Sequence, residues 1–205
     1  MTTPGHVILL PVKPVSIGKS RLDGVLGVRR SELARAFALD TAMAARAASS
    51  VQAVLVVTDD HRFAAEFSVR GFATIPDGVA GDLNGTLAQA AIEAQRRWPG
   101  TVPVALCADL PALLPEDLDL ALGTSSPSFV ADADGVGTTM YAAPLDDFRP
   151  SFGPDSRSRH LAGGATEVAG VLRTLRRDVD DPAALQDALV LGVGVHTARM
   201  FSEPL

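Results

Sequence analysis

Short apolar runs alternate with helical patterns along most of the chain, and this alternation constrains the fold more than any other feature. Apolar runs of strand length are expected at residues 7–10, 54–58, 73–75, 102–107, 129–131, 138–142 and 175–179. Helices are expected at residues 31–49, 61–69, from the stretch 81–85 to about 97, 115–122 and 182–189, with Ser31 as the cap of the first. Residues 147–164 are polar and irregular, with at most one helical turn expected. This order favours one α/β domain over residues 1–205, with a mostly parallel sheet covered by helices on both faces.

The loops that follow the expected strands carry most of the polar candidates for a site. In open α/β sheets, ligands bind beyond the carboxyl ends of the strands. The loop 11–22, Asp59, the stretch 77–84 and Asp109 all follow strands. We therefore expect them to converge on one crevice.

Both lysines of the chain, Lys13 and Lys19, lie in the loop after the first strand, and all other basic side chains apart from histidine are arginines. A lysine ammonium binds phosphate as a compact point charge. The tripeptide Gly18-Lys19-Ser20 is reminiscent of a P-loop, but that motif needs a glycine where Lys13 stands. The loop therefore predicts a phosphate-binding site of another kind, and the alternative is an ordinary exposed loop.

Acidic residues at two places are candidates for a metal site. Asp109 follows the expected strand 102–107, where a carboxylate is well placed to hold Mg²⁺ on a nucleotide; alternatively it is a turn or capping residue. Asp178 and Asp180 alternate along an expected extended segment, and Asp181 before Pro182 is expected to cap the following helix. Because Mg²⁺ takes one or two carboxylates together with water and phosphate oxygens, Asp109 with either Asp178 or Asp180 would suffice.

Two loops of small residues, 135–139 and 151–156, can offer backbone N–H groups and hydroxyls to an anion, or can be ordinary turns. His160 stands between Arg157 and Arg159; it is a possible base, but a surface position is the favoured interpretation. Cys107, the single cysteine, is expected in the core and excludes an internal disulfide.

Composition restricts the class of partner. The net charge of −6 argues against general nucleic-acid binding, which needs a basic face. We see no apolar run of about 20 residues, as a membrane span requires, and no signal peptide, so we expect a cytoplasmic protein with no membrane partner. A basic loop in an acidic protein suits a small anionic ligand. Oligomeric state is left open.

A series of short motifs then occurs in a specific order. They are Pro11-Val12-Lys13 with Gly18-Lys19-Ser20-Arg21-Leu22, Gly81-Asp82-Leu83-Asn84, Ala108-Asp109-Leu110-Pro111, Phe129-Val130-Ala131-Asp132, Gly137-Thr138-Thr139, Phe152-Gly153-Pro154-Asp155-Ser156 and Asp178-Val179-Asp180-Asp181-Pro182. With them the chain resembles, nearly from end to end, the 2-phospholactate/phosphoenolpyruvate guanylyltransferases of deazaflavin coenzyme F(420) biosynthesis. The resemblance implies a GT-A-like, Rossmann-like nucleotidyltransferase fold. One departure is Asp181, where many relatives carry threonine; aspartate also caps a helix.

The resemblance further implies a Mg²⁺-dependent reaction in which GTP and a small phosphorylated three-carbon acid give a guanylylated acid and pyrophosphate. It assigns the triphosphate to Lys13, Lys19 and Arg21, and the nucleoside to Gly81, Asp82 and Asn84. It assigns Mg²⁺ to Asp109 and Asp178, with Asp180 as a further candidate. It assigns the carboxylate of the acid to Thr138, Gly153 and Ser156.

The resemblance favours phosphoenolpyruvate, or 2-phospho-L-lactate, as the acid, and the residues themselves leave the choice among these two and 3-phosphoglycerate open. The alternatives are a cytidylyl- or molybdopterin guanylyltransferase of the same fold, against which the motif 152–156 argues, and a non-catalytic nucleotide-binding module.

Overall fold

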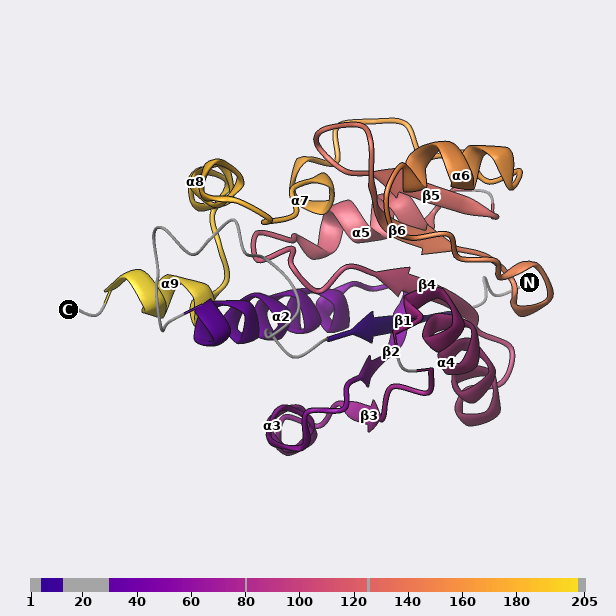
Figure 1. The fold of residues 1–205 in the computed structure, drawn as a ribbon, viewed down its shortest axis with the longest axis horizontal. Coiled ribbons are helices and arrows are strands. Elements are labelled where there is room, and N and C mark those ends of the chain that lie inside the picture. Colours follow the sequence, from indigo (N-terminus) through magenta and orange to yellow (C-terminus); the bar gives the residue numbers. More distant parts are fainter. Residues whose placement is uncertain (1–4, 13–29, 80, 125, 203–205) are drawn as a thin grey trace.

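The computed structural model describes residues 5–12, 30–79, 81–124 and 126–202 (Figure 1). The strands are β1 (His6–Pro11), β2 (Val51–Val57), β3 (Ala73–Ile75), β4 (Val102–Leu106), β5 (Ser128–Ala131), β6 (Thr138–Ala142) and β7 (Thr166–Glu167). The helices are α2 (Arg30–Ala47), α3 (His61–Val69), α4 (Leu83–Arg97), α5 (Pro115–Leu122), the 3₁₀ turn η3 (Leu145–Asp147), α6 (Ser156–Ala162), α7 (Arg173–Arg176), α8 (Pro182–Leu191) and α9 (Val195–Ser202).

The described strands form one seven-stranded sheet in the order β3-β2-β1-β4-β6-β5-β7. The first four in this order are parallel, β6 is antiparallel to both β4 and β5, and β7 is parallel to β5. The prediction of a mostly parallel sheet is confirmed. The chain leaves β1 toward β2 on one side, whereas β4 lies on the other side, so the strand order switches between β1 and β4. This is the place where open α/β sheets bind ligands.

Side chains that alternate along the buried strands build a core on each face of the sheet. Ile8 and Leu10 of β1 belong to a cluster with residues of α2, α3, α5 and α7. Val7 and Leu9 belong to another cluster, formed with α4 and the segment around Phe148 and Phe152. The sheet is therefore covered on both faces, with α4 opposite α2 (Figure 1).

A third cluster packs α8 and α9 against α2, at the left of Figure 1. The buried carboxylate of Asp40 in α2 accepts hydrogen bonds from the backbone N–H groups of His196 (3.0 Å) and Thr197 (2.7 Å) at the start of α9. An aspartate there satisfies N–H groups that a helix leaves without an internal partner. Among the described residues, every helix is too short or too polar to span a lipid bilayer.

The structure differs from the sequence-based expectation in several places. The strand predicted at 175–179 is wrong, since α7 ends at Arg176 and residues 177–179 are irregular. Its apolar residues belong to two clusters instead. Leu175 packs in the cluster that contains Ile8 and Leu10, and Val179 packs in the cluster of α2, α8 and α9. Ser31 lies within α2 rather than capping it, and residues 147–164 contain the seven-residue helix α6. The short strand β7 and helix α9 were not predicted.

Candidate active site

Aspartates gather at the edge of the sheet where β4 and β5 end. Asp109 comes shortly after β4, and Asp132 directly follows β5. The N–H of Val179 donates to the backbone carbonyl of Asp109 (3.0 Å), which holds the segment with Asp178 and Asp180 against the loop after β4. Residues 109 and 178–180 therefore lie side by side.

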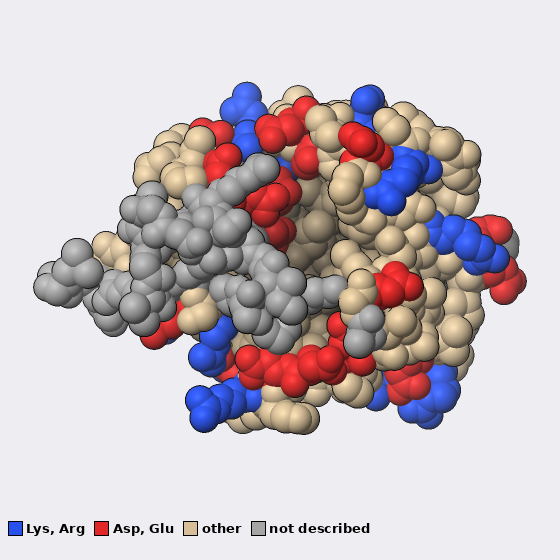
Figure 2. Space-filling view, in the orientation of Figure 1, with Lys and Arg blue, Asp and Glu red and all other residues tan. Residues whose placement is uncertain are grey.

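The charges of these aspartates act on one another. Burial first, and then the negative charges of Asp109, Asp180 and Asp132, together raise the pKa of Asp178 from 3.8 to about 7. Asp178 is half-buried, Asp180 is exposed, and one carboxylate oxygen of Asp109, Oδ1, is buried. Like charges held this close favour a bound cation. Figure 2 shows a hollow near the middle of the face seen in Figure 1, with acidic side chains gathered on two sides of the hollow.

No group of three or more His, Cys, Asp or Glu side chains forms a complete metal cage within the part of the chain that the structure describes. A Mg²⁺ site does not require one, because water and substrate phosphates fill most of its octahedral shell. Carboxylate oxygens are hard donors of the kind that Mg²⁺ prefers, so this open group of aspartates fits a Mg²⁺ site. Which carboxylates bind the ion stays a prediction.

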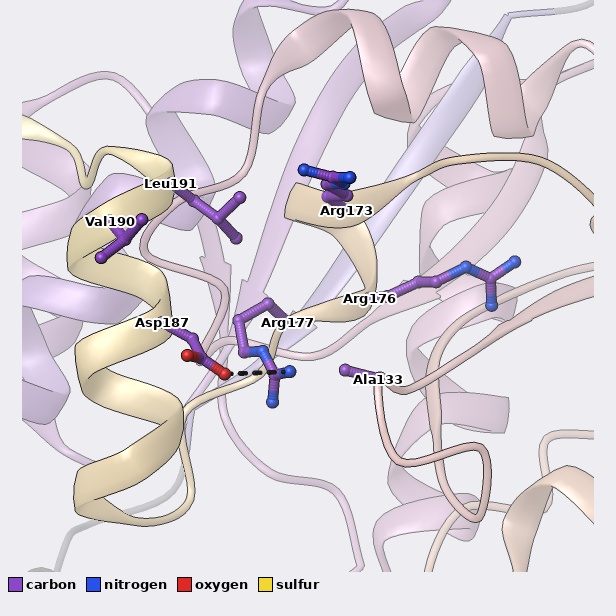
Figure 3. A pocket seen from close by; sticks show the side chains of 7 residues that line it. All are labelled: Ala133, Arg173, Arg176, Arg177, Asp187, Val190 and Leu191. Carbon is purple, nitrogen blue, oxygen red and sulfur yellow. Dashed lines mark ion pairs between the residues drawn. The ribbon is translucent and has the colours of Figure 1, made fainter.

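Two arginines immediately before Asp178, Arg176 at the end of α7 and Arg177 after it, connect this segment to neighbouring elements. The guanidinium of Arg176 donates to the carbonyls of Ala131 (3.0 Å) and Val168 (2.8 Å), and Arg177 pairs with Asp187 of α8 (3.2 Å). These side chains and Arg173 line a cavity of about 410 Å³ between α7 and α8. Figure 3 shows that the three guanidinium groups point in different directions, so they do not converge on one anion.

The predicted acceptor residues lie at the start of β6 and around α6. Because β6 runs antiparallel to β4, its first residue, Thr138, lies at the same edge as Asp109 and opposite Ala131, beside Asp132. Thr138 and Ser156 are buried, and the hydroxyl of Thr138 lies 3.0 Å from Nδ1 of His160. Gly153 has a φ of +116°, a conformation that side-chain-bearing residues rarely adopt.

The loop that contains Gly153 is fastened at two points. The side chain of Asn84 both donates to the carbonyl of Phe152 (3.1 Å) and accepts from its N–H (2.8 Å). The N–H of Ser151 donates to Nε2 of His160 (3.0 Å). Asn84, which the resemblance assigns to the nucleoside, therefore joins the start of α4 to the predicted acceptor loop.

The segment before α4 has its own internal order. Asp82 caps α4 by accepting from the N–H of Gly85 (3.0 Å), and Gly81 has a φ of +78°. Asp59 accepts from the N–H of Asp77 (2.8 Å), so the loops after β2 and β3 meet, as expected. Gly81 and Asp82 are exposed at the edge of the sheet, and their contact with a nucleoside stays a prediction.

The basic loop, with Lys13, Lys19 and Arg21, lies outside the described residues. Its point of departure is described: β1 ends at Pro11, and Val12 donates its N–H to the carbonyl of Val57 (2.8 Å). The loop thus begins at the place where the strand order switches.

Two residues near the site were misjudged or missed. His160 was expected at the surface, but only 2% of it is exposed, so that prediction is wrong. Its spacing of four from Ser156 places both on one face of α6, whereas Arg157 and Arg159 flank that face. Asp132 had no role in the predicted metal site, although its position after a buried strand matched that of Asp109.

Comparison with known proteins gives consistent relatives. A phosphoenolpyruvate guanylyltransferase of Thermomonospora curvata is 47% identical over 198 residues, covering 94% of this chain and 87% of the relative. One from Streptomyces coelicolor is 43% identical over 203 residues, covering 94% of each.

Solved structures share the fold. A putative nucleotide-diphospho-sugar transferase from Desulfovibrio desulfuricans superposes with a TM-score of 0.59 at 17% identity, covering 92% of this chain and 97% of the other. A 4-diphosphocytidyl-2C-methyl-D-erythritol synthase gives 0.60 at 11% identity, covering 92% and 99%. The nucleotidyltransferase fold predicted from the sequence is confirmed. The family model described as "Guanylyl transferase CofC like" matches residues 6–201, and the chain belongs to this family.

Proposed function

We propose that the chain transfers GMP from GTP to the phosphate of phosphoenolpyruvate and releases pyrophosphate, as a step of coenzyme F(420) biosynthesis. The names of relatives that align with 94% of the chain support guanylyl transfer with this acceptor. The observation that carries the proposal is the meeting of Asp109 and Asp178, beyond the switch in strand order, with Thr138 at the same edge of the sheet.

The proposal gives each part of this edge one role. Lys13, Lys19 and Arg21 hold the triphosphate of GTP, and the start of α4 lies along its nucleoside. Asp109 and Asp178, with Asp180, hold Mg²⁺, which would offset the negative charge of the phosphates. Thr138, Gly153 and Ser156 bind the carboxylate of the acceptor.

The reaction needs charge neutralisation and alignment more than proton transfer. An oxygen of the acceptor phosphate attacks the α-phosphorus of GTP, the bond from that phosphorus to the bridging oxygen breaks, and pyrophosphate leaves. The attacking phosphate is ionised at neutral pH, so no general base is required. The residues of the chain therefore act by binding both substrates in line. A buried histidine with a low pKa beside the acceptor pocket agrees with this, because it is neutral at pH 7.

A screen of acceptors tests the proposal. The protein is incubated with GTP and Mg²⁺ together with phosphoenolpyruvate, 2-phospho-L-lactate or 3-phosphoglycerate, and released pyrophosphate is measured. CTP replaces GTP in a parallel series. We expect release with GTP and phosphoenolpyruvate at the highest kcat/KM. A preference for CTP would favour a cytidylyltransferase, and GTP binding without release in any mixture would favour a non-catalytic module.

A further inference from the structure

His160 is a buried polar side chain next to the proposed acceptor residues Thr138 and Ser156. Its ring stacks on Tyr141 (4.7 Å between ring centres, 21° between planes) and on Phe129 (5.5 Å, 26°). Phe152 meets it edge-on (5.4 Å, 78°). Rings packed in this way leave the imidazole a single orientation.

The hydrogen bonds of His160 define where its proton lies. A backbone N–H can only donate, so Nε2 accepts from Ser151 and carries no proton. Burial is the largest cause of a pKa of about 4 for His160; a hydrogen bond to the Ser156 backbone raises the pKa, and the charge of Arg159 lowers it. The ring is therefore neutral at pH 7, and its one proton lies on Nδ1, which faces the hydroxyl of Thr138 at 3.0 Å.

This arrangement determines how Thr138 meets a ligand. A hydroxyl carries one proton and can accept as well as donate. Because the Thr138 oxygen accepts from Nδ1–H, its own proton is directed away from His160 and is available to a carboxylate. At the same time Nε2 fixes Ser151, two residues before Gly153, while Asn84 fixes Phe152.

We propose that His160 is the positioning residue of the acceptor site: it orients the Thr138 hydroxyl as a donor to the acceptor's carboxylate and anchors the loop that carries Gly153. The inference rests on the proposed function. It gives His160 no contact with substrate and no part in proton transfer.

Two substitutions separate the two contacts. The amide of His160→Gln reaches about as far as Nε2 and can keep the bond to Ser151, but it loses the bond to Thr138. The amide of His160→Asn is placed like Nδ1 and can keep the bond to Thr138. Ser158→Ala, at an exposed position of the same helix, is the matched control.

We expect His160→Gln to raise the KM for phosphoenolpyruvate about tenfold or more, the size expected for losing one hydrogen bond to a charged group. The KM for GTP should not change. Thr138→Val should have a similar effect on its own, and His160→Gln should add little in the Thr138→Val background, because His160 acts on the substrate only through the Thr138 hydroxyl. His160→Asn should fall between wild type and His160→Gln.

A measurement on the unsubstituted protein keeps the inference testable if the variants do not fold. In ¹⁵N-histidine NMR, one imidazole should remain neutral down to about pH 4, with its proton on Nδ1, and its signals should shift on addition of phosphoenolpyruvate. A proton on Nε2 of this ring would overturn the inference.

The kinetic outcomes separate this inference from the proposed function. Equal increases of both KM values in His160→Gln, or full additivity with Thr138→Val, would mean a general structural role and would overturn the positioning role alone. A wild-type protein that transfers no GMP to phosphoenolpyruvate would overturn the proposed function itself.

Discussion

Replacing Asp178 by asparagine should stabilise the metal-free protein at pH 8. Its pKa is raised from 3.8 to about 7, first by burial and then by the charges of Asp109, Asp180 and Asp132. A group whose pKa is higher in the folded state contributes its full stability below the unfolded pKa, and loses it as the pH rises through the folded pKa. The loss therefore runs from about pH 4 to about pH 7, and above that the ionised carboxylate opposes folding.

The size of this effect follows from the two pKa values. At about 1.4 kcal/mol for each pKa unit, the rise corresponds to about 4 kcal/mol. Water reaches the half-buried Asp178 and the exposed Asp180, so screening reduces the expected gain to about 2–3 kcal/mol. For a chain of this size that is a rise of roughly 5–10 °C in melting temperature.

Thermal unfolding with a chelator present, at pH 5 and pH 8, measures the effect. The melting temperature of Asp178→Asn should exceed that of the wild type, and the difference should be larger at pH 8. Asp146→Asn removes an exposed carboxylate of η3 and serves as the matched control. A loss of stability in Asp178→Asn at pH 8, or a gain of equal size at both pH values, would refute the electrostatic argument.

Four further predictions follow from the site and the fold. Asp109→Asn should lower kcat/KM at limiting Mg²⁺ by about 100-fold or more with the fold intact; near-wild-type rates would remove this residue from the metal site. Lys19→Ala should raise the KM for GTP, and Lys19→Arg should restore it only in part, because a planar guanidinium does not replace an ammonium; unchanged GTP kinetics would contradict this. Gly153→Val should impair phosphoenolpyruvate binding more than GTP binding in separate titrations, and the reverse would mean that the two subsites are exchanged. Asp119→Ala should lower the free energy of unfolding by about 1–2 kcal/mol at pH 7 in urea titrations. Burial alone would raise the pKa of Asp119, but hydrogen bonds from Ser50 and Ser49 outweigh it and lower the pKa to about 2. The stabilisation by Asp119 is therefore present above about pH 4 and is lost as the pH falls through about 2. A free energy of unfolding unaffected by the substitution would count against this prediction.

Local signals were enough to predict much of the sheet and several helices. The bounds of α3 and α5 match the expected ranges, because Asp60 caps the one and Pro115 begins the other. Buried strands such as β1 are recognisable because their side chains are apolar on both faces. Asp109, after β4, was predictable as a site residue because the ends of parallel strands meet at one edge of the sheet.

The elements that were missed depend on contacts between distant residues. Helix α9 begins where Asp40, more than 150 residues earlier, accepts its first N–H groups. The position of His160 depends on rings contributed by β5, β6 and the loop before α6, while its own helix is too short to reveal a buried face by periodicity. The joint role of Asn84 and His160 in fastening residues 151–152 likewise depends on tertiary contacts.

The most direct test of the account is ³¹P NMR of the protein with GTP, phosphoenolpyruvate and Mg²⁺. The account predicts equal amounts of pyrophosphate and of guanylylated phosphoenolpyruvate, seen as two coupled phosphorus signals, with the reaction greatly slowed in Asp109→Asn. Release of pyrophosphate with GMP as the product and phosphoenolpyruvate unconsumed would contradict it.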